Sequence, residues 1–176
     1  LNINNKDFIY LNVGAMTWNK GVNKLLVAFS MIKKKYPFVK LILKDQSKLY
    51  TLGAEKVIQN TLKKFPNLIT NEVLKSIIII TKNLNLLELR ELYCASDAYI
   101  SPYRAEGFNI PPLEAAACGI PIILTSGGST DDYYHPSYVL KVKGKNIIKN
   151  NRYYIEPDLD HLISNMSNII NKNNLK

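Results

Sequence analysis

Short apolar runs of strand length alternate with amphipathic helical patterns along this chain of 176 residues. The four consecutive isoleucines of Ile77–Ile80 are typical of a strand that is buried on both faces of a parallel sheet. Such alternation predicts a Rossmann-like α/β fold, in which a parallel sheet of about six strands carries helices on both faces. We therefore expect the loops that follow the strands to meet at one edge of the sheet.

The bounds of the expected elements lie where short apolar runs typical of strands change to the i, i+3, i+4 spacing of apolar residues that is typical of helices. The expected strands span residues 8–13, 39–43, 76–81, 98–101, 122–125 and 138–142, the last of them at an edge of the sheet. The expected helices span residues 22–32, 54–65, 85–95 and 158–170, with a short helix after residue 109 and one helical turn at 131–134. The polar segment 143–152 is expected to be a mobile loop.

Residues 103–119 have the sequence of a turn that leads directly into this short helix. Asn109 is suited to cap the start of the helix, Pro111 to its first helical position, and Gly119 to the left-handed residue that ends it. The free backbone amides of residues 107–110 would then point out of the positive end of the helix dipole. This arrangement suits a phosphate or a sugar hydroxyl.

Two carboxylates flank the start of this helix, because Glu106 lies in the loop before it and Glu114 in its first turn. A carboxylate accepts two hydrogen bonds from a vicinal diol, which a ribose or a hexose offers. Either residue alone is also explained without a ligand, since the helix dipole favours an acid in the first turn and a loop acid is commonly solvated. Together with the amides between them, the two acids predict a nucleotide-sugar site.

Motifs for several other chemistries are missing from the sequence. No Gly-x-Gly-x-x-Gly follows the first strand and no Walker motif occurs, which disfavours dinucleotide oxidoreductases and P-loop nucleotidases. Ser101 and Ser126 end strands outside any Gly-x-Ser-x-Gly elbow, which disfavours hydrolases. His135 and His161 are far apart and have no companion ligands, so we expect ordinary surface or half-buried histidines, no metal site and no cofactor.

The formal net charge of +9 implies attraction to anions such as nucleoside diphosphates, and it makes an acidic lipid surface a further candidate partner. Basic residues are spread along the chain, whereas nucleic-acid binding usually concentrates them on one face with aromatics on which bases stack, so nucleic acid is not an expected partner. No apolar run approaches the roughly 18 residues of a membrane-spanning helix. Cys94 and Cys118 are interpreted as buried free thiols in a reducing compartment, which predicts a cytoplasmic protein that is at most peripheral at a membrane.

The phrase from Glu106 to Pro121 resembles the signature of the retaining GT-B glycosyltransferases called family four or group 1, in which seven residues separate two glutamates. The resemblance covers nearly the whole chain. It implies the C-terminal, donor-binding domain of such an enzyme, whose N-terminal acceptor domain lies outside this chain. The implied substrate is a nucleoside-diphosphate sugar, with uridine and guanosine diphosphate sugars as candidates, and the implied reaction retains the anomeric configuration.

The resemblance also implies a role for each matching residue. Glu106 would contact the donor sugar and Lys20 would neutralise the diphosphate, so these two are the expected catalytic residues. Glu114 would hold the ribose. The base would be held at the end of the third strand by Thr81, Lys82 and Asn83. The sugar and diphosphate would also contact Gly14, Gly107, Phe108, Asn109 and Ile110.

One departure from the family pattern concerns the loop after the first strand. The family usually pairs its lysine with an arginine a few residues earlier, whereas this chain has Ala-Met-Thr-Trp-Asn at residues 15–19. Arg104, on the facing loop, is a candidate for the missing charge. The departure also motivates an alternative function, namely a catalytically silent domain that binds nucleotide sugars or serves as a scaffold.

Overall fold

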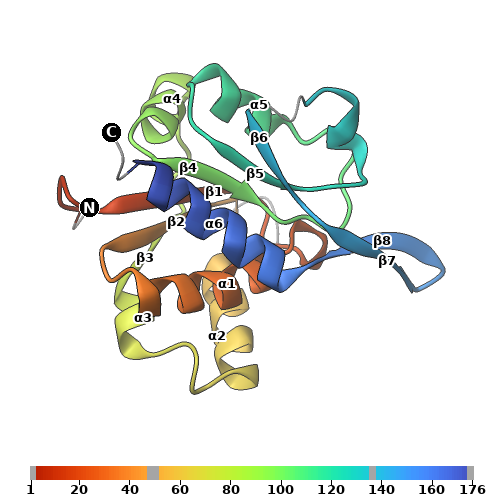
Figure 1. Cartoon of the computed structure of the whole chain (residues 1–176), viewed down its shortest axis with the longest axis horizontal. Helices are drawn as coiled ribbons and strands as arrows, with labels where there is room; N and C mark the ends of the chain where they lie inside the picture. Colours follow the sequence, from red (N-terminus) through yellow and green to blue (C-terminus); the bar gives the residue numbers. More distant parts are fainter. Residues whose placement is uncertain (1–2, 47–51, 135–137, 174–176) are drawn as a thin grey trace.

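A computed structural model describes residues 3–46, 52–134 and 138–173 of the chain (Figure 1). Within these residues, six parallel strands form one sheet in the order β3-β2-β1-β4-β5-β6. The strands are β1 Phe8–Gly14, β2 Val39–Asp45, β3 Ile77–Ile80, β4 Ala98–Ser101, β5 Ile122–Thr125 and β6 Val139–Val142. The predicted parallel α/β fold is confirmed, and the strand expected at an edge lies at an edge.

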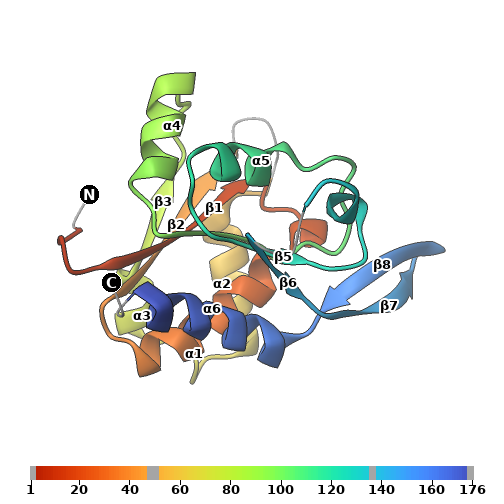
Figure 2. The same cartoon turned by 45° about the horizontal axis from the view of Figure 1, so that its top comes forward.

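Helices cover both faces of this sheet (Figure 2). One face carries α1 Val22–Lys35, α2 Ala54–Lys64, α3 Asn71–Lys75 and α6 Leu159–Asn173. The opposite face carries α4 Leu86–Cys94 and α5 Ile110–Ala117. Two short 3-10 helices, η1 Trp18–Lys20 and η2 Ser129–Asp132, lie in the loops that follow β1 and β5.

Each face of the sheet has its own hydrophobic core, because successive side chains of a strand point to opposite faces. Tyr10, Leu41 and Ile100 pack beneath α1 and α6. Leu11 and Tyr99 pack on the side of α4 and α5. Every residue of β1 is buried, as expected for the central strand of a sheet that is covered on both faces.

The prediction of a mobile loop at residues 143–152 is wrong, because this segment forms most of a β-hairpin. Strand β7 Gly144–Lys149 pairs antiparallel with β8 Arg152–Pro157. The turn consists of Asn150 and Asn151, with φ angles of 52° and 56°. Two-residue hairpin turns require this left-handed conformation, which asparagine tolerates, so the Asn-Asn pair was the signal that could have revealed the hairpin. The hairpin projects beyond the edge of the sheet (Figure 1).

The expected boundaries of α5 are partly correct. Gly119 has a φ of 74° and ends the helix as predicted. Asn109 precedes the helix in a left-handed conformation, and its side chain does not cap the helix, contrary to expectation. The side-chain amide of Asn109 instead donates to the Ser101 hydroxyl over 3.5 Å. Pro111 is the second residue of the helix, since α5 begins at Ile110.

The interpretation of the cysteines as buried thiols is wrong for Cys94, which is exposed, and Cys118 is half-buried. Nδ1 of His161 accepts a hydrogen bond from the backbone amide of Lys143 at 2.9 Å, which is an ordinary structural role. His135 lies outside the described residues. In the part of the chain that the structure describes, every helix is too short or too polar to cross a membrane.

Candidate functional site

The loops that follow β1 and β4 meet at the carboxyl edge of the sheet, where the order of the strands reverses. The chain builds outward from β1 to β3 and then returns to add β4 on the other side of β1. Parallel sheets of this kind bind ligands in the crevice at such a point. The backbone carbonyl of Asn19 accepts a hydrogen bond from the backbone amide of Arg104 at 2.6 Å. The side-chain amide of Asn19 donates to the Ala105 carbonyl at 3.2 Å. These bonds hold the two loops together.

The predicted pair Lys20 and Glu106 lies within this junction. Nζ of Lys20 is 2.5 Å from Oε1 of Glu106, and the glutamate side chain is only 8% exposed. A Cβ built on Gly14 would lie 3.9 Å from the Lys20 ammonium. Because glycine has no side chain, the backbone of residue 14 is uncovered beside this ammonium. Apart from Lys20, Oε1 of Glu106 has no hydrogen-bond partner among the described residues. Three predicted site residues are thus brought together, and the Lys20 ammonium covers a buried oxygen of Glu106.

Burial raises the pKa of the Glu106 carboxyl above its usual value, and Lys20 only partly opposes this shift. Ionised Glu106 neutralises Lys20, whereas protonated Glu106 leaves the ammonium able to bind an anion. We therefore expect the Glu106→Gln variant to bind inorganic pyrophosphate about fivefold more tightly than the unmodified chain at about pH 8, the effect of removing one ion-pair partner. The two affinities should converge as the pH falls through the raised pKa of Glu106, because Glu106 itself becomes protonated.

Calorimetric titration of both proteins with pyrophosphate over this range measures the effect. The comparison between the two proteins cancels the protonation of pyrophosphate itself. A ratio of affinities that stays constant with pH would contradict the coupling between Glu106 and Lys20.

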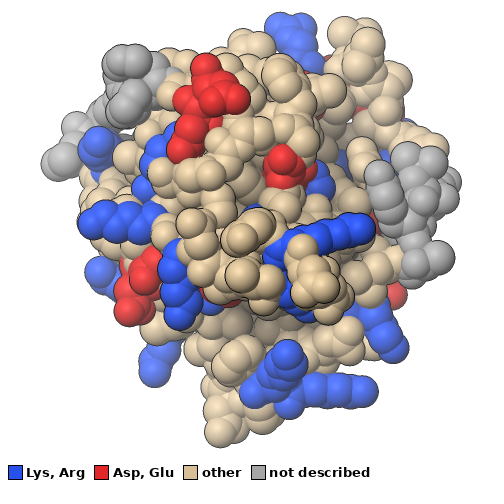
Figure 3. Space-filling view, turned by 90° about the vertical axis from the view of Figure 1, so that its right-hand side faces the viewer, with Lys and Arg blue, Asp and Glu red and all other residues tan. Residues whose placement is uncertain are grey.

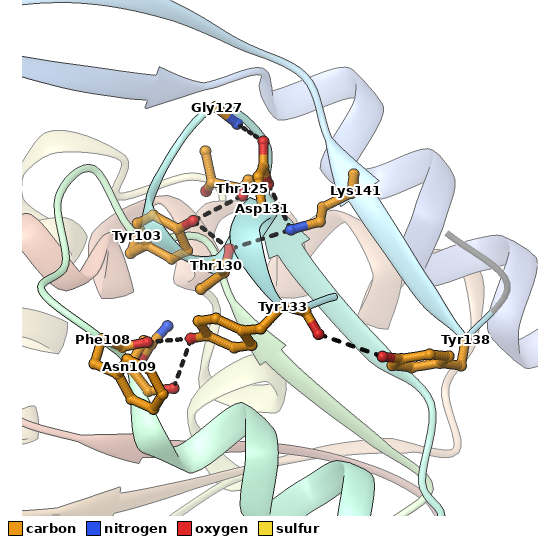
Figure 4. A network of polar contacts seen from close by, with 10 residues as sticks. All are labelled: Tyr103, Phe108, Asn109, Thr125, Gly127, Thr130, Asp131, Tyr133, Tyr138 and Lys141. Atoms are coloured by element: carbon orange, nitrogen blue, oxygen red, sulfur yellow. Dashed lines mark hydrogen bonds and ion pairs between the residues drawn. The ribbon is translucent and has the colours of Figure 1, made fainter. Parts of the chain in front are cut away.

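Tyr133 contacts the loop at residues 107–110 through hydrogen bonds and ring stacking (Figure 4). The Tyr133 hydroxyl donates to the carbonyls of Phe108 and Asn109, and the rings of Tyr133 and Phe108 stack with centroids 4.9 Å apart. Within the described residues, the backbone amides of 107–110 donate no hydrogen bond. These amides therefore remain available to an anion or a hydroxyl in front of the α5 start, as predicted from the sequence.

The neighbouring loop after β5 is fixed by a second set of contacts (Figure 4). The Tyr103 hydroxyl donates to the Thr125 carbonyl at 3.0 Å and lies 2.5 Å from the Thr130 hydroxyl. Asp131 accepts the Gly127 amide at 2.6 Å and pairs with the Lys141 ammonium at 2.6 Å. The site is therefore framed by loops whose conformations are set before any ligand arrives.

Glu114 lies on the other side of the α5 start, against α4. Its Oε2 accepts a hydrogen bond from the Tyr93 hydroxyl at 2.7 Å, and its side chain is half-buried. Tyr93 was not found from the sequence, where it belonged to the apolar stripe of an expected helix. Glu114 is not in the first turn of α5, contrary to expectation, because the helix begins at Ile110 and its first turn contains no acid. Glu106 and Glu114 also have different partners.

Of the three residues expected at the base, Asn83 lines a hollow. This hollow of about 300 Å³ also includes Val13 and Leu89, so it opens between the end of β1 and α4. Thr81 is exposed, and the Lys82 ammonium pairs with Glu88 at 2.7 Å on the surface. Asn83 therefore lies in the same hollow as Val13, next to Gly14, whereas Lys82 is paired with Glu88 on the surface.

Arg104 does not supply the charge that the loop after β1 lacks. Its side chain is 3% exposed, and its guanidinium forms a two-point pair with the Glu156 carboxylate. The same group donates to the Trp18 carbonyl at 2.7 Å and to Asn23 Oδ1 at 3.0 Å. All of these partners belong to the protein, so Arg104 is a structural residue.

Sequence reasoning also missed a hollow on the Glu106 side of the site. This hollow of about 500 Å³ is bordered by Glu106, by Trp18 of η1 and by Arg152, Tyr153 and Tyr154 of β8. Ile155 anchors the strand there, since its amide donates to the Arg104 carbonyl at 2.8 Å. The contribution of β8 was not foreseen, because the hairpin itself was not expected.

A protein-family model described as "Glycosyl transferases group 1" matches residues 1–147. No curated protein matches the chain by sequence. Among solved structures, the chain is similar to sucrose-phosphate synthase from Thermosynechococcus elongatus, with a TM-score of 0.73 and 21% identity over 96% of this chain and 37% of that one. It is also similar to a UDP-forming trehalose-phosphate synthase from Burkholderia xenovorans, with a TM-score of 0.68 and 12% identity over 94% and 37% of the two chains.

A third similar structure is the C-terminal domain of a group 1 family glycosyl transferase from Francisella tularensis. Its TM-score is 0.66 and its identity 18%, over 96% of this chain and 77% of that one. At such identities the likeness concerns the fold, which is that of the C-terminal domain of GT-B glycosyltransferases. The chain spans 37% of the length of the two synthases.

Proposed function

We propose that this chain, which belongs to the group 1 family of glycosyl transferases, binds the nucleoside-diphosphate sugar from which a sugar is transferred. The observation that supports this proposal is the half-buried pair of Lys20 and Glu106 at the strand-order reversal. A cation and a carboxylate lie there, and the unbonded amides of residues 107–110 follow Glu106 in the same loop. A ligand that combines phosphates with vicinal hydroxyls matches both groups.

In the proposed complex the donor extends along the carboxyl edge of the sheet. The base occupies the hollow at Asn83, and Glu114 accepts hydrogen bonds from the ribose hydroxyls. The diphosphate passes the bare backbone of Gly14 and draws Lys20 away from Glu106. The released carboxylate oxygen then accepts a hydroxyl of the sugar.

Lys20 contributes to the reaction through its charge. The diphosphate becomes more negative as the glycosidic bond breaks, so a fixed ammonium stabilises the transition state more than the bound donor. In the proposed retaining reaction, the acceptor attacks the face from which the diphosphate leaves, and the leaving phosphate takes the acceptor proton. The acceptor itself is held by an N-terminal domain of the longer protein.

The test of donor binding is the Glu114→Gln variant, which keeps an oxygen for the Tyr93 hydroxyl but removes the charge. Calorimetry with uridine diphosphate and guanosine diphosphate should show binding to the unmodified chain. Glu114→Gln should weaken it about tenfold or more, as expected for hydrogen bonds to a charged acceptor. Glu91→Gln is the matched control, because Glu91 is an exposed acid of the neighbouring helix α4. The assignment fails if neither nucleotide binds at millimolar concentration, or if both variants bind equally well.

One observation favours the alternative of a catalytically silent domain, namely the small number of cations that the site loops offer to a diphosphate. The loop after β1 provides only Lys20, and Arg104 is occupied by Glu156. A domain with one cation could hold the nucleotide sugar without accelerating its cleavage. Sugar transfer by the full-length protein would exclude this alternative.

A further inference from the structure

The tip of the β7–β8 hairpin carries two cations on one face. Lys149 and Arg152 are directly opposite each other in the antiparallel register, on either side of the Asn-Asn turn. Directly opposite side chains lie on the same face of a strand pair, and like charges in such positions repel each other. An acid at either position would stabilise the hairpin, so this pair is not explained by the stability of the turn.

The same face of the hairpin is directed toward the candidate site. Nζ of Lys149 lies 3.7 Å from the centroid of the Trp18 ring, and Tyr154 packs edge to face on that ring at 5.0 Å. Trp18 begins η1, which ends at Lys20. The contact with the indole therefore holds the Lys149 ammonium beside the junction of the two site loops.

The charge of these two cations is not neutralised within the described part of the chain. Glu156 is the only acid of the hairpin, and it is occupied by Arg104 and by Lys24, whose ammonium is 2.8 Å away. None of the ion pairs formed by described residues includes Lys149 or Arg152. Figure 3 views this end of the molecule, where Lys and Arg side chains are prominent and Asp and Glu are sparse.

Arg152 borders the same hollow as Glu106, and Lys149 lies over the Trp18 ring, which also borders it. Arg152 lines this hollow of about 500 Å³ together with Trp18 and Tyr154. Hollows of roughly 300–1,000 Å³ hold small ligands in proteins. The carboxylate in this lining suits hydroxyl groups, and the guanidinium in it suits an anion. The hollow therefore fits a ligand that carries both.

We propose that Lys149 and Arg152 bind an anionic group, a phosphate or a carboxylate, of a substrate whose hydroxyl-bearing part reaches Glu106. This proposal rests on the proposed function in one respect, namely that Glu106 contacts a sugar. The anionic group belongs either to the donor, as its diphosphate, or to the acceptor. The hairpin is then a substrate-binding element of the domain.

The experiment is a titration of the isotope-labelled chain with inorganic phosphate, followed through the backbone amide signals in NMR spectra. Phosphate should shift the amides of residues 149–152. Lys149→Gln and Arg152→Gln should each weaken phosphate binding about tenfold, the loss expected for one charge-assisted contact. The matched control is Lys145→Gln, which removes the same charge from β7 about 13 Å along the strand. This control should weaken binding less than about twofold.

A second titration with uridine and guanosine diphosphate identifies the source of the anion. If nucleotide displaces phosphate and Arg152→Gln weakens nucleotide binding, the anion is the donor diphosphate. If phosphate binds the nucleotide-saturated chain undiminished, the anion belongs to the acceptor. Glu114→Gln should affect nucleotide binding alone, so a failure of the donor assignment is distinguishable from a failure of the hairpin site.

Two results would overturn the hairpin site. One is the absence of phosphate-induced shifts at residues 149–152. The other is an equal effect of all three substitutions, which would show only a general response to net charge. Thermal unfolding of each variant confirms folding, which these exposed positions should leave intact.

Discussion

The Gly21→Ala variant is expected to lose about 4 kcal/mol of its free energy of unfolding, in the range of the most damaging single substitutions. Gly21 precedes α1, and its φ angle is 70°. A Cβ at this position would lie 1.8 Å from the Pro102 carbonyl oxygen and 2.8 Å from its carbonyl carbon. Both atoms belong to the backbone of the loop after β4, so relief requires the two site loops to separate.

Gly119→Ala provides a matched control for the steric part of this effect. Its φ angle is 74°, almost the same as that of Gly21, but an added Cβ would meet nothing within 4 Å. The control should therefore lose only about 1 kcal/mol, the strain of a left-handed alanine. Urea unfolding of both variants measures the difference. Equal losses would show that the approach of Gly21 to Pro102 does not restrict this position.

The Arg104→Met variant is expected to lose about 3 kcal/mol of its free energy of unfolding, because one partner of a buried ion pair disappears while the other stays. Glu156 would keep only Lys24, and the Trp18 carbonyl would lose its charged donor. Lys82→Met breaks an ion pair whose lysine is 71% exposed, and it should cost less than about 1 kcal/mol. Chemical denaturation of the two variants compares the pairs.

The double variant Arg104→Met with Glu156→Gln separates the ion pair from the packing of the arginine. It should be more stable than Arg104→Met alone, because no unpaired buried charge remains. A double variant that is less stable than Arg104→Met would show that Glu156 is satisfied without Arg104. Pyrophosphate binding by any folded Arg104→Met protein should be retained, since Arg104 has only protein partners.

The pH dependence of the free energy of unfolding provides a second test of the ion pair between Arg104 and Glu156. Burial alone would raise the pKa of Glu156, but Arg104 and Lys24 outweigh burial and hold this pKa below its usual range. A lowered pKa in the folded state adds stability at neutral pH, which is lost as the pH falls through the folded value. Arg104→Met should therefore show a smaller loss of stability on acidification than the unmodified chain.

The sequence by itself determined the parallel α/β fold and the end of α5, because the relevant information is local. Four consecutive isoleucines correctly predicted a strand, but the expectation that it is buried on both faces is wrong, because β3 lies at an edge of the sheet and its residues are half-buried. Gly119 ends a helix through its own backbone freedom. The position of the candidate site followed from the same reasoning, since loops after parallel strands share one edge. The roles of Lys20 and Glu106, by contrast, were expected only through a resemblance to a family, and the ion pair between them was not expected.

Only the tertiary structure decided which partners distant residues have. Arg104 appeared as a free cation in sequence, but it pairs with Glu156, which is 52 positions away and lies on an unexpected strand. Likewise, an asparagine beside a helix start suggested a cap, yet the side-chain amide of Asn109 donates a hydrogen bond to Ser101. Local patterns record the conformational preferences of neighbouring residues, whereas these contacts depend on how the strands are ordered. That order arises from the burial of the whole sheet, which no short stretch of this chain encodes.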